Sequence, residues 1–165
     1  MISLRGTGLG PRSMADAPNA ANAPLVLYVD DERPNRIVFE ASLRNEFRIK
    51  SVADAKSALE FLASDEVAVL VTDIRMPEMD GLELLAIVKE RHPQTLRMVI
   101  TAFSDIDPIL RAINEGLVAR YIIKPFERDE LTQVLRWATE LYSFGKESAE
   151  LLKRILQTEL LASLG

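Results

Sequence analysis

The sequence contains no cysteine and a single histidine, His92, among its 165 residues. The chain can therefore form no disulfide, and it offers neither a cysteine nucleophile nor a thiolate ligand for a soft metal. The lack of cysteine is compatible with a reducing cytoplasm, where disulfides are rare. Any metal that this chain binds is expected to be a hard cation held by oxygen atoms.

Positive charge and long apolar runs are also scarce. The net charge of −5 does not favour a surface that binds nucleic acid, because such surfaces usually carry a basic patch. No apolar run reaches the roughly 18 residues that span a bilayer. The first residues have no apolar core of the kind found in signal peptides. We therefore expect a soluble cytoplasmic protein that binds neither DNA nor a membrane directly.

What the sequence does contain is a regular alternation of short apolar runs and helical periods. Residues 1–23, rich in Gly, Ala, Pro and Asn, precede it and predict a flexible tail. The apolar runs lie at residues 25–29, 67–71, 98–100 and 121–123, with a weaker one at 47–52. Such runs are typical of strands buried on both faces of a parallel sheet. The intervening helical periods lie at residues 34–46, 55–62, 81–91 and 106–117, and Asp54 is the expected cap of the second. This alternation predicts a doubly wound α/β domain with a five-stranded parallel sheet over residues 24–143.

The last part of the chain predicts a helical extension. At ~1.5 Å per residue, the ~37 residues from Arg128 to Leu164 would reach ~55 Å, longer than a domain of this size. We expect Gly145 to break this segment into two helices. Residues 144–165 carry an apolar face with no domain of its own to cover, formed by Leu151, Leu152, Ile155, Leu156, Leu160, Leu161 and Leu164. We expect it to pair with a second copy in a homodimer or to connect to a partner; the alternative is that it folds back onto the domain.

Polar residues follow the apolar runs at positions that point to chemistry. Asp30, Asp31, Asp73, Thr101 and Lys124 all fall at carboxyl ends of predicted strands, where open α/β sheets bind ligands. Taken singly, each could be a cap, a strand former or a solvated charge. Together, three carboxylates in one crevice need compensation, which Mg²⁺ and an ammonium group can supply. The same charges neutralise phosphoryl oxygens, and an aspartate is a known kind of phosphoryl acceptor.

Several motifs make the chain similar to the response-regulator receiver family of bacterial two-component signalling, over roughly residues 24–143. They are Leu27-Tyr28-Val29-Asp30-Asp31-Glu32, Thr72-Asp73-Ile74-Arg75-Met76-Pro77-Glu78-Met79-Asp80-Gly81, Thr101-Ala102 and Lys124-Pro125-Phe126. The resemblance implies a flavodoxin-like fold with strand order 2-1-3-4-5. It also implies a cis peptide bond before Pro125.

The resemblance implies a role for each matched residue. Asp73 would be the phosphoacceptor. Asp31 and Asp73, with the backbone carbonyl of Arg75, would ligate Mg²⁺, while Asp30 would act mainly through bound water. Lys124 would contact the phosphoryl group.

Three further positions follow from the same resemblance. Thr101 would be the switch hydroxyl and Tyr121 the switch aromatic. Arg75 and Phe103 occupy the two variable positions that tune phosphoryl lifetime in the family, and their size predicts a long-lived phosphorylated form.

The expected function is a phosphoacceptor switch that takes its phosphoryl group from a sensor histidine kinase or a phosphotransfer protein and signals through protein contact or dimerisation. Its own chemistry would be limited to self-phosphorylation from small donors and autodephosphorylation, so it would not be an enzyme. Two alternatives remain open. One is a phosphorylation-independent scaffold. The other is a metal-dependent aspartyl phosphohydrolase of the haloacid dehalogenase type, in which an Asp acid–base group would stand where Arg75 stands here.

Overall fold

The computed structural model describes residues 22–163, so the tail predicted for residues 1–23 lies almost wholly outside the described residues. The sheet consists of β1 (Leu25–Val29), β2 (Arg48–Val52), β3 (Val69–Thr72), β4 (Leu96–Thr101) and β5 (Arg120–Ile123). All neighbouring strands are parallel, and their order is β2-β1-β3-β4-β5. The predicted five-stranded sheet and its strand order are confirmed.

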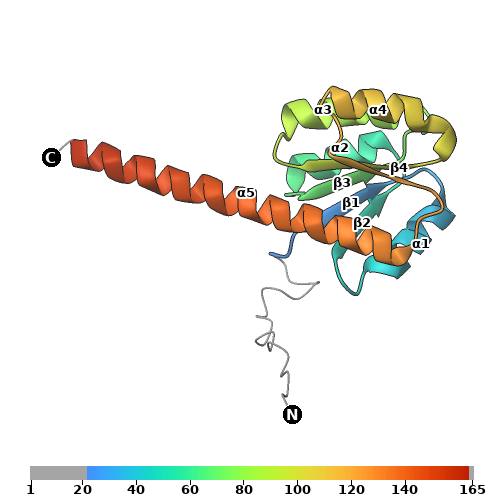
Figure 1. Cartoon of the computed structure of the whole chain (residues 1–165), viewed down its shortest axis with the longest axis horizontal. Coiled ribbons are helices and arrows are strands. Elements are labelled where there is room, and N and C mark those ends of the chain that lie inside the picture. The colour runs from blue at the N-terminus through green and yellow to red at the C-terminus, as the bar shows by residue number, and fades with distance from the viewer. Residues whose placement is uncertain (1–21, 164–165) are drawn as a thin grey trace, which may run out of the picture.

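Five helices cover the sheet. They are α1 (Arg33–Leu43), α2 (Ala55–Ser64), α3 (Gly81–Arg91), α4 (Ile106–Asn114) and α5 (Arg128–Ser163), and a 3-10 turn, η2 (Phe103–Asp105), precedes α4. α1 and α5 lie against one face of the sheet, and α2, α3 and α4 lie against the other (Figure 1). This is the predicted doubly wound, flavodoxin-like arrangement.

Strand β1 shows why the apolar runs form central strands. All five of its residues are buried, and successive side chains point to opposite faces of the sheet. Leu27 packs in the core beneath α2, α3 and α4, whereas Val26 and Tyr28 pack in the core beneath α1 and α5. A strand covered on both faces needs apolar side chains at every position, so the continuous run is the expected pattern.

Aspartate side chains cap the N-termini of α2 and α3. The Asp54 side chain accepts a hydrogen bond of 2.7 Å from the Ser57 backbone N–H at the start of α2. The Asp80 side chain accepts one of 2.9 Å from the Glu83 N–H at the start of α3. Each satisfies one of the unpaired donors at a helix N-terminus. The peptide bond between Lys124 and Pro125 is cis, as the resemblance implied.

α5 is one uninterrupted helix of 36 residues, so the predicted break at Gly145 is wrong. A glycine inside a helix costs only about 1 kcal/mol relative to alanine, and the two residues that follow this one, Lys146 and Glu147, are good helix formers. The first part of α5 packs on the sheet through Leu131, Leu135 and Ala138. From Gly145 onward the described side chains are exposed and the helix projects beyond the domain instead of folding back (Figure 1).

A small cluster holds α5 where it leaves the domain. The Lys146 ammonium lies 2.8 Å from the Glu66 carboxylate, and the Tyr142 hydroxyl donates to the same carboxylate. Glu66 belongs to the connection between α2 and β3. In the part of the chain that the structure describes, no helix combines the length and apolarity needed to cross a membrane.

Candidate functional site

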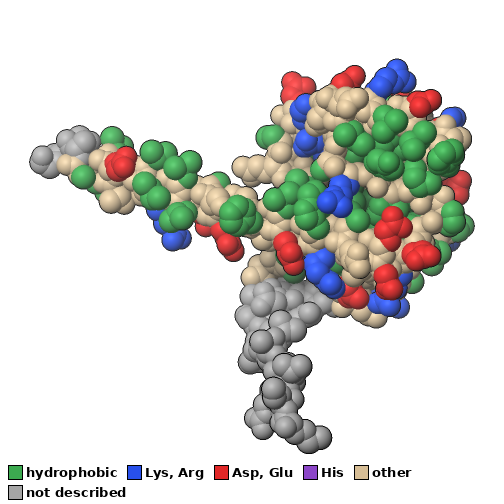
Figure 2. Space-filling model, viewed as in Figure 1, with side chains coloured by type: hydrophobic (Ala, Val, Ile, Leu, Met, Phe, Trp, Pro, Cys, Tyr) green, Lys and Arg blue, Asp and Glu red, His purple; other side chains and the backbone are tan. Residues whose placement is uncertain are grey.

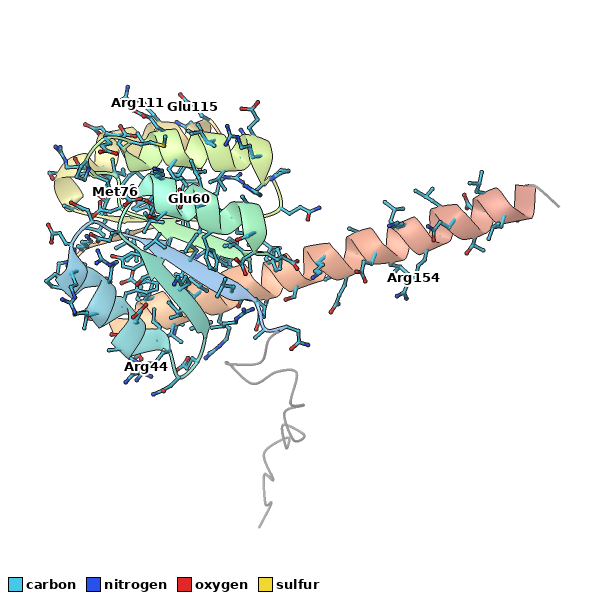
Figure 3. All side chains as sticks on the ribbon, turned by 180° about the vertical axis from the view of Figure 1, so that it is seen from behind. Arg44, Glu60, Met76, Arg111, Glu115 and Arg154 are labelled. Atoms are coloured by element: carbon cyan, nitrogen blue, oxygen red, sulfur yellow. The ribbon has the colours of Figure 1, made fainter. Side chains whose placement is uncertain are left out.

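The sheet brings the predicted polar residues together at one edge. Asp30 follows β1, Asp73 follows β3, Thr101 ends β4 and Lys124 follows β5. Backbone hydrogen bonds fix the spacing: Asp73 N–H donates to the Val29 carbonyl at 3.1 Å, and Lys124 N–H donates to the Thr101 carbonyl at 2.8 Å. Met76, three residues beyond Asp73, marks this end of the domain in Figure 3, opposite the projecting part of α5.

The Asp73 carboxylate lies at the centre of the cluster. Its Oδ2 accepts a hydrogen bond of 2.6 Å from Lys124 Nζ, and its Oδ1 accepts bonds from the Thr101 hydroxyl at 3.1 Å and the Ile74 N–H at 2.7 Å. Burial alone would lower the pKa of Lys124, but hydrogen bonds and charge attraction from Asp73 and Asp30 outweigh it and raise that pKa above its usual range. Lys124 is therefore a fixed cation beside the predicted acceptor.

Asp30 is fully buried, and both of its oxygens are already occupied by donors. Oδ2 accepts from Tyr28 at 2.7 Å, Asn35 at 3.1 Å and Lys124 at 3.2 Å, while Oδ1 accepts from the Glu32 N–H at 2.9 Å. Burial would raise the pKa of Asp30, but these donors together lower it. Three donors crowd Oδ2, and Oδ1 already accepts one hydrogen bond, so Asp30 keeps little free acceptor capacity. This favours the water-mediated role expected for Asp30 over a direct metal bond.

The donors that would surround a metal are all hard oxygens. Asp31 is exposed, Asp73 is half-buried, and the Arg75 backbone carbonyl lies in the same loop as Asp73. In the described residues, no group of three acidic, histidine or cysteine side chains forms a ready-made metal site. Two carboxylates, a carbonyl and water nevertheless match the ligands that Mg²⁺ prefers. The chemistry of this donor set fits the expected ion.

Arg75 and Asp105 form a pair that the sequence did not predict. Arg75 Nε donates to the two Asp105 oxygens at 2.8 and 3.0 Å, and the Arg75 guanidinium approaches Asp105 Oδ1 at 2.6 Å. This guanidinium lowers the pKa of Asp105 and outweighs the opposite effect of burial. The pair joins the loop after β3 to the turn η2 after β4, and both residues line one cleft with Ile74 and Pro108.

The two predicted aromatic positions lie beside this edge rather than in it. Tyr121 in β5 is in register with Val99, two residues before Thr101 on β4, and it is partly exposed. The Phe103 side chain is 71% exposed at the start of η2. Among the described residues, no contact of either ring with Lys124 or Thr101 is recorded.

Gly81 permits the close approach of α3 to the end of β3. Its N–H donates to the Ile74 carbonyl at 2.8 Å. A Cβ atom at this position would lie 2.1 Å from the Asp73 carbonyl oxygen. Only glycine fits this contact, so Gly81 helps to hold the loop that carries Asp73.

A parallel sheet of this order, with an aspartate, a lysine and a threonine grouped at its carboxyl edge, defines a receiver-type α/β domain. Residues 26–136 match the family model of the response regulator receiver domain. The chain therefore belongs to the response regulator receiver family, as the motifs indicated, and it is a receiver of two-component signalling.

Relatives agree with this assignment. The chain is 37% identical over 115 residues to the hydrogenase transcriptional regulatory protein HoxA of Cupriavidus necator, and 38% identical over 119 residues to the DNA-binding transcriptional regulator NtrC of Escherichia coli. These matches cover 70% and 72% of this chain but 24% and 25% of the relatives. The chain thus spans about a quarter of the length of these curated relatives.

A solved structure supports the same fold. The signal receiver domain of an HD domain-containing protein from Pseudomonas fluorescens Pf-5 matches with a TM-score of 0.69 and 35% sequence identity, covering 73% of this chain and 97% of that chain. The region of similarity is the domain itself, with most of the remaining length lying at the ends of this chain.

Proposed function

We propose that Asp73 is the phosphoacceptor of this receiver. The observation that carries the proposal is the position of its carboxylate between the Lys124 ammonium and the Thr101 hydroxyl. A carboxylate oxygen would form the new bond to phosphorus while the bond between phosphorus and the donor's leaving group breaks. Lys124 would neutralise the phosphoryl oxygens and Thr101 would donate a hydrogen bond to one of them. Tyr121, on the neighbouring strand β5, is the proposed switch aromatic, which would respond to phosphorylation of Asp73.

Mg²⁺ is the metal that we propose for this site. Asp31, Asp73 and the Arg75 carbonyl would hold it, with Asp30 acting through water. The ion would supply positive charge beside the phosphoryl oxygens when bound. Lys124, already paired with Asp73, would supply a second positive charge at the same carboxylate.

We expect phosphorylation by a small phosphodonor to require Mg²⁺, because three clustered carboxylates otherwise repel an anionic donor. The full chain is incubated with the donor, and its intact mass is measured with the metal and with excess chelator. Asp31→Asn should raise the Mg²⁺ concentration for half-maximal phosphorylation by about tenfold or more. Asp30→Asn should raise it less, because the Asp30 oxygens already accept four hydrogen bonds. Equal phosphorylation in chelator would contradict the metal requirement.

The phosphoryl donor that we propose in the cell is a sensor histidine kinase or a phosphotransfer protein. We propose no turnover chemistry beyond self-phosphorylation and loss of the phosphoryl group. The residue two beyond Asp73 is Arg75, engaged with Asp105, so it offers no acid–base carboxylate for a phosphohydrolase. A scaffold that ignores phosphate would not need the Lys124–Asp73 pair.

The cytoplasmic location stays a prediction. Direct DNA contact is not expected for this chain, although a longer relative, of which the match covers 25%, is named as a DNA-binding transcriptional regulator.

We also propose that the projecting part of α5 pairs with a second copy of this chain. Hydrophobic side chains gather along it (Figure 2), and the exposed ones are Phe144, Leu151, Leu152, Ile155, Leu156, Leu160 and Leu161. A spacing of alternately three and four residues runs through Leu141, Phe144, Ser148, Leu151, Ile155, Thr158 and Ala162. This is the seven-residue repeat of a two-stranded coiled coil. Of the exposed apolar side chains, Phe144, Leu151 and Ile155 lie on this seam, and Leu152 and Leu161 lie beside it. Pairing would remove their apolar area from water, at ~25 cal/mol per Å².

Charge selects a parallel arrangement of the two helices. With the seam above, Arg154 flanks it on one side and Glu159 on the other. In a parallel, in-register pair these positions meet across the interface, so Arg154 of each copy would face Glu159 of its partner. Figure 3 shows the Arg154 side chain on the projecting part of α5, away from the domain.

We expect Ile155→Lys in the full chain to convert the dimer into a monomer at micromolar concentration, because it places a charge in the seam. Lys153→Glu is the matched control, since residue 153 lies on the outer side of the repeat. Arg154→Glu should weaken the dimer, and adding Glu159→Arg should restore it. Sedimentation velocity measures the oligomeric state of the wild-type chain and of the four variants. A wild-type chain that sediments as a monomer would contradict the dimer.

A further inference from the structure

The side chain of Tyr28 reaches the cluster of polar residues from inside the domain. Tyr28 lies in β1 and Asp30 follows two residues later, and side chains two residues apart point to the same face of an extended strand. The Tyr28 ring is fully buried and stacks on Phe39 of α1, with the ring centroids 4.0 Å apart. Its hydroxyl donates to Asp30 Oδ2 at 2.7 Å. The packing of the ring therefore holds the hydroxyl on the Asp30 carboxylate.

The Lys124 ammonium is shared between two carboxylates. Its Nζ lies 2.6 Å from Asp73 Oδ2 and 3.2 Å from Asp30 Oδ2. The Asp30 side chain is 1% exposed, so protein donors, rather than bulk water, must satisfy its charge. The Tyr28 hydroxyl meets part of this demand at the same oxygen that attracts Lys124. With that demand met, the ammonium can stay closer to Asp73 than to Asp30.

We propose that Tyr28 is a positioning residue for phosphorylation: its hydroxyl satisfies Asp30 and so keeps the Lys124 ammonium on the acceptor Asp73. The inference rests on the proposed role of Asp73. It extends the site by a buried strand residue whose recorded side-chain contacts are with Asp30 and Phe39. Tyr28 acts on the acceptor through the sharing of one cation between two carboxylates.

Tyr28→Phe removes the hydroxyl and keeps the aromatic ring. Asp30 Oδ2 then retains two donors, Asn35 and Lys124. Asn35 also donates to Glu32, whereas the long Lys124 side chain can shift between its two carboxylates. The ammonium therefore moves toward Asp30, and less positive charge remains beside the phosphoryl oxygens. The acceptor carboxylate also loses part of its cation, which makes it a better ligand for Mg²⁺.

Two measurements on the full chain test the inference. The first is the rate of phosphorylation by a small phosphodonor at saturating Mg²⁺, followed by intact mass, which should be roughly threefold to tenfold lower in Tyr28→Phe. The second is Mg²⁺ binding to the unphosphorylated chain, followed by amide NMR, which should become tighter by about twofold. Tyr142→Phe is the matched control, because its hydroxyl donates to Glu66 where α5 leaves the domain, and it should change neither quantity.

A double variant tests the path through Asp30. Tyr28→Phe combined with Asp30→Asn is expected to match Asp30→Asn alone in both measurements, because a neutral side chain no longer draws Lys124 from Asp73. Three results would overturn the inference: an unchanged rate in Tyr28→Phe, Mg²⁺ binding that is not tighter, or a further slowing by Tyr28→Phe in the Asp30→Asn background. Slower phosphorylation with weaker Mg²⁺ binding would mean that the hydroxyl only supports the fold of the site. A wild-type chain that takes up no phosphoryl group would instead refute the role of Asp73, so the two failures are distinguishable.

Discussion

Asp73→Asn is expected to abolish the phosphoryl adduct completely while leaving the domain folded. The amide oxygen can still accept hydrogen bonds from Thr101 and the Ile74 N–H, so the loop keeps its main contacts. Lys124 remains paired with Asp30 at 3.2 Å. What disappears is the anionic oxygen that attacks phosphorus, and no other group is placed to replace it between Lys124 and Thr101.

The matched control for this experiment is Asp80→Asn. Asp80 also follows β3 in the chain, but its carboxylate caps α3. The structure records no contact between the Asp80 and Lys124 side chains. Asparagine caps helices as well as aspartate does, so stability should be retained. Intact mass after incubation with donor and Mg²⁺ should show the adduct in Asp80→Asn and none in Asp73→Asn. An undiminished adduct in Asp73→Asn would remove the assignment.

Gly81→Ala should cause a large loss of stability. The added Cβ would lie 2.1 Å from the Asp73 carbonyl oxygen and 2.9 Å from the Ile74 Cα, and both are backbone atoms with no rotamer to change. Relief requires α3 to move away from the end of β3. We expect the free energy of unfolding to fall by about 3 kcal/mol or more.

Gly145→Ala provides the opposite expectation from the same chemical change. No atom lies within 4 Å of a Cβ at this position, and the residue is inside α5. Alanine should therefore raise the free energy of unfolding by about 0.5–1 kcal/mol through helix propensity. Denaturant unfolding of both variants against wild type measures the difference. Equal stability of the two variants would show that α3 does not approach Asp73 as closely as the structure indicates.

The sheet and its edge residues could be predicted because they depend on patterns within single strands. The run from Leu25 to Val29 is wholly apolar since both faces of β1 are covered, and the polar residues begin where the strand ends. Parallel strands bring such ends to the same edge. Asp30, Asp73, Thr101 and Lys124 therefore met at the expected place.

The continuity of α5 was not predictable from Gly145 alone. A glycine within a sequence is compatible with a helix end or a helix interior, and the difference in free energy is about 1 kcal/mol. The tertiary contacts of Tyr142 and Lys146 with Glu66 hold the helix on both sides of the point where it leaves the domain. These contacts join residues far apart in sequence, which no local pattern reveals.

Asp105 and Tyr28 were missed for a related reason. Asp105 is one acid in a turn after β4, and only folding places it against Arg75. Tyr28 reads as an apolar strand residue, but its hydroxyl donates to Asp30 at 2.7 Å while its ring stacks on Phe39. Burial and the bond to Asp30 raise the pKa of Tyr28, so the hydroxyl stays a donor. A strand tyrosine two residues before an acid is a signal that could have indicated this contact.

Mapping the phosphorylated residue tests the central claim most directly. Borohydride reduces an acyl phosphate to an alcohol, and trypsin then separates the candidate aspartates, because Asp73 lies in peptide 57–75 and both Asp30 and Asp31 lie in peptide 13–36. We expect the reduced residue at position 73 of wild-type chain treated with phosphodonor and Mg²⁺, and at no other position. Reduction at Asp30 or Asp31, or an unmodified peptide 57–75 from a chain that carries the intact-mass adduct, would contradict the assignment of Asp73 as the phosphoacceptor.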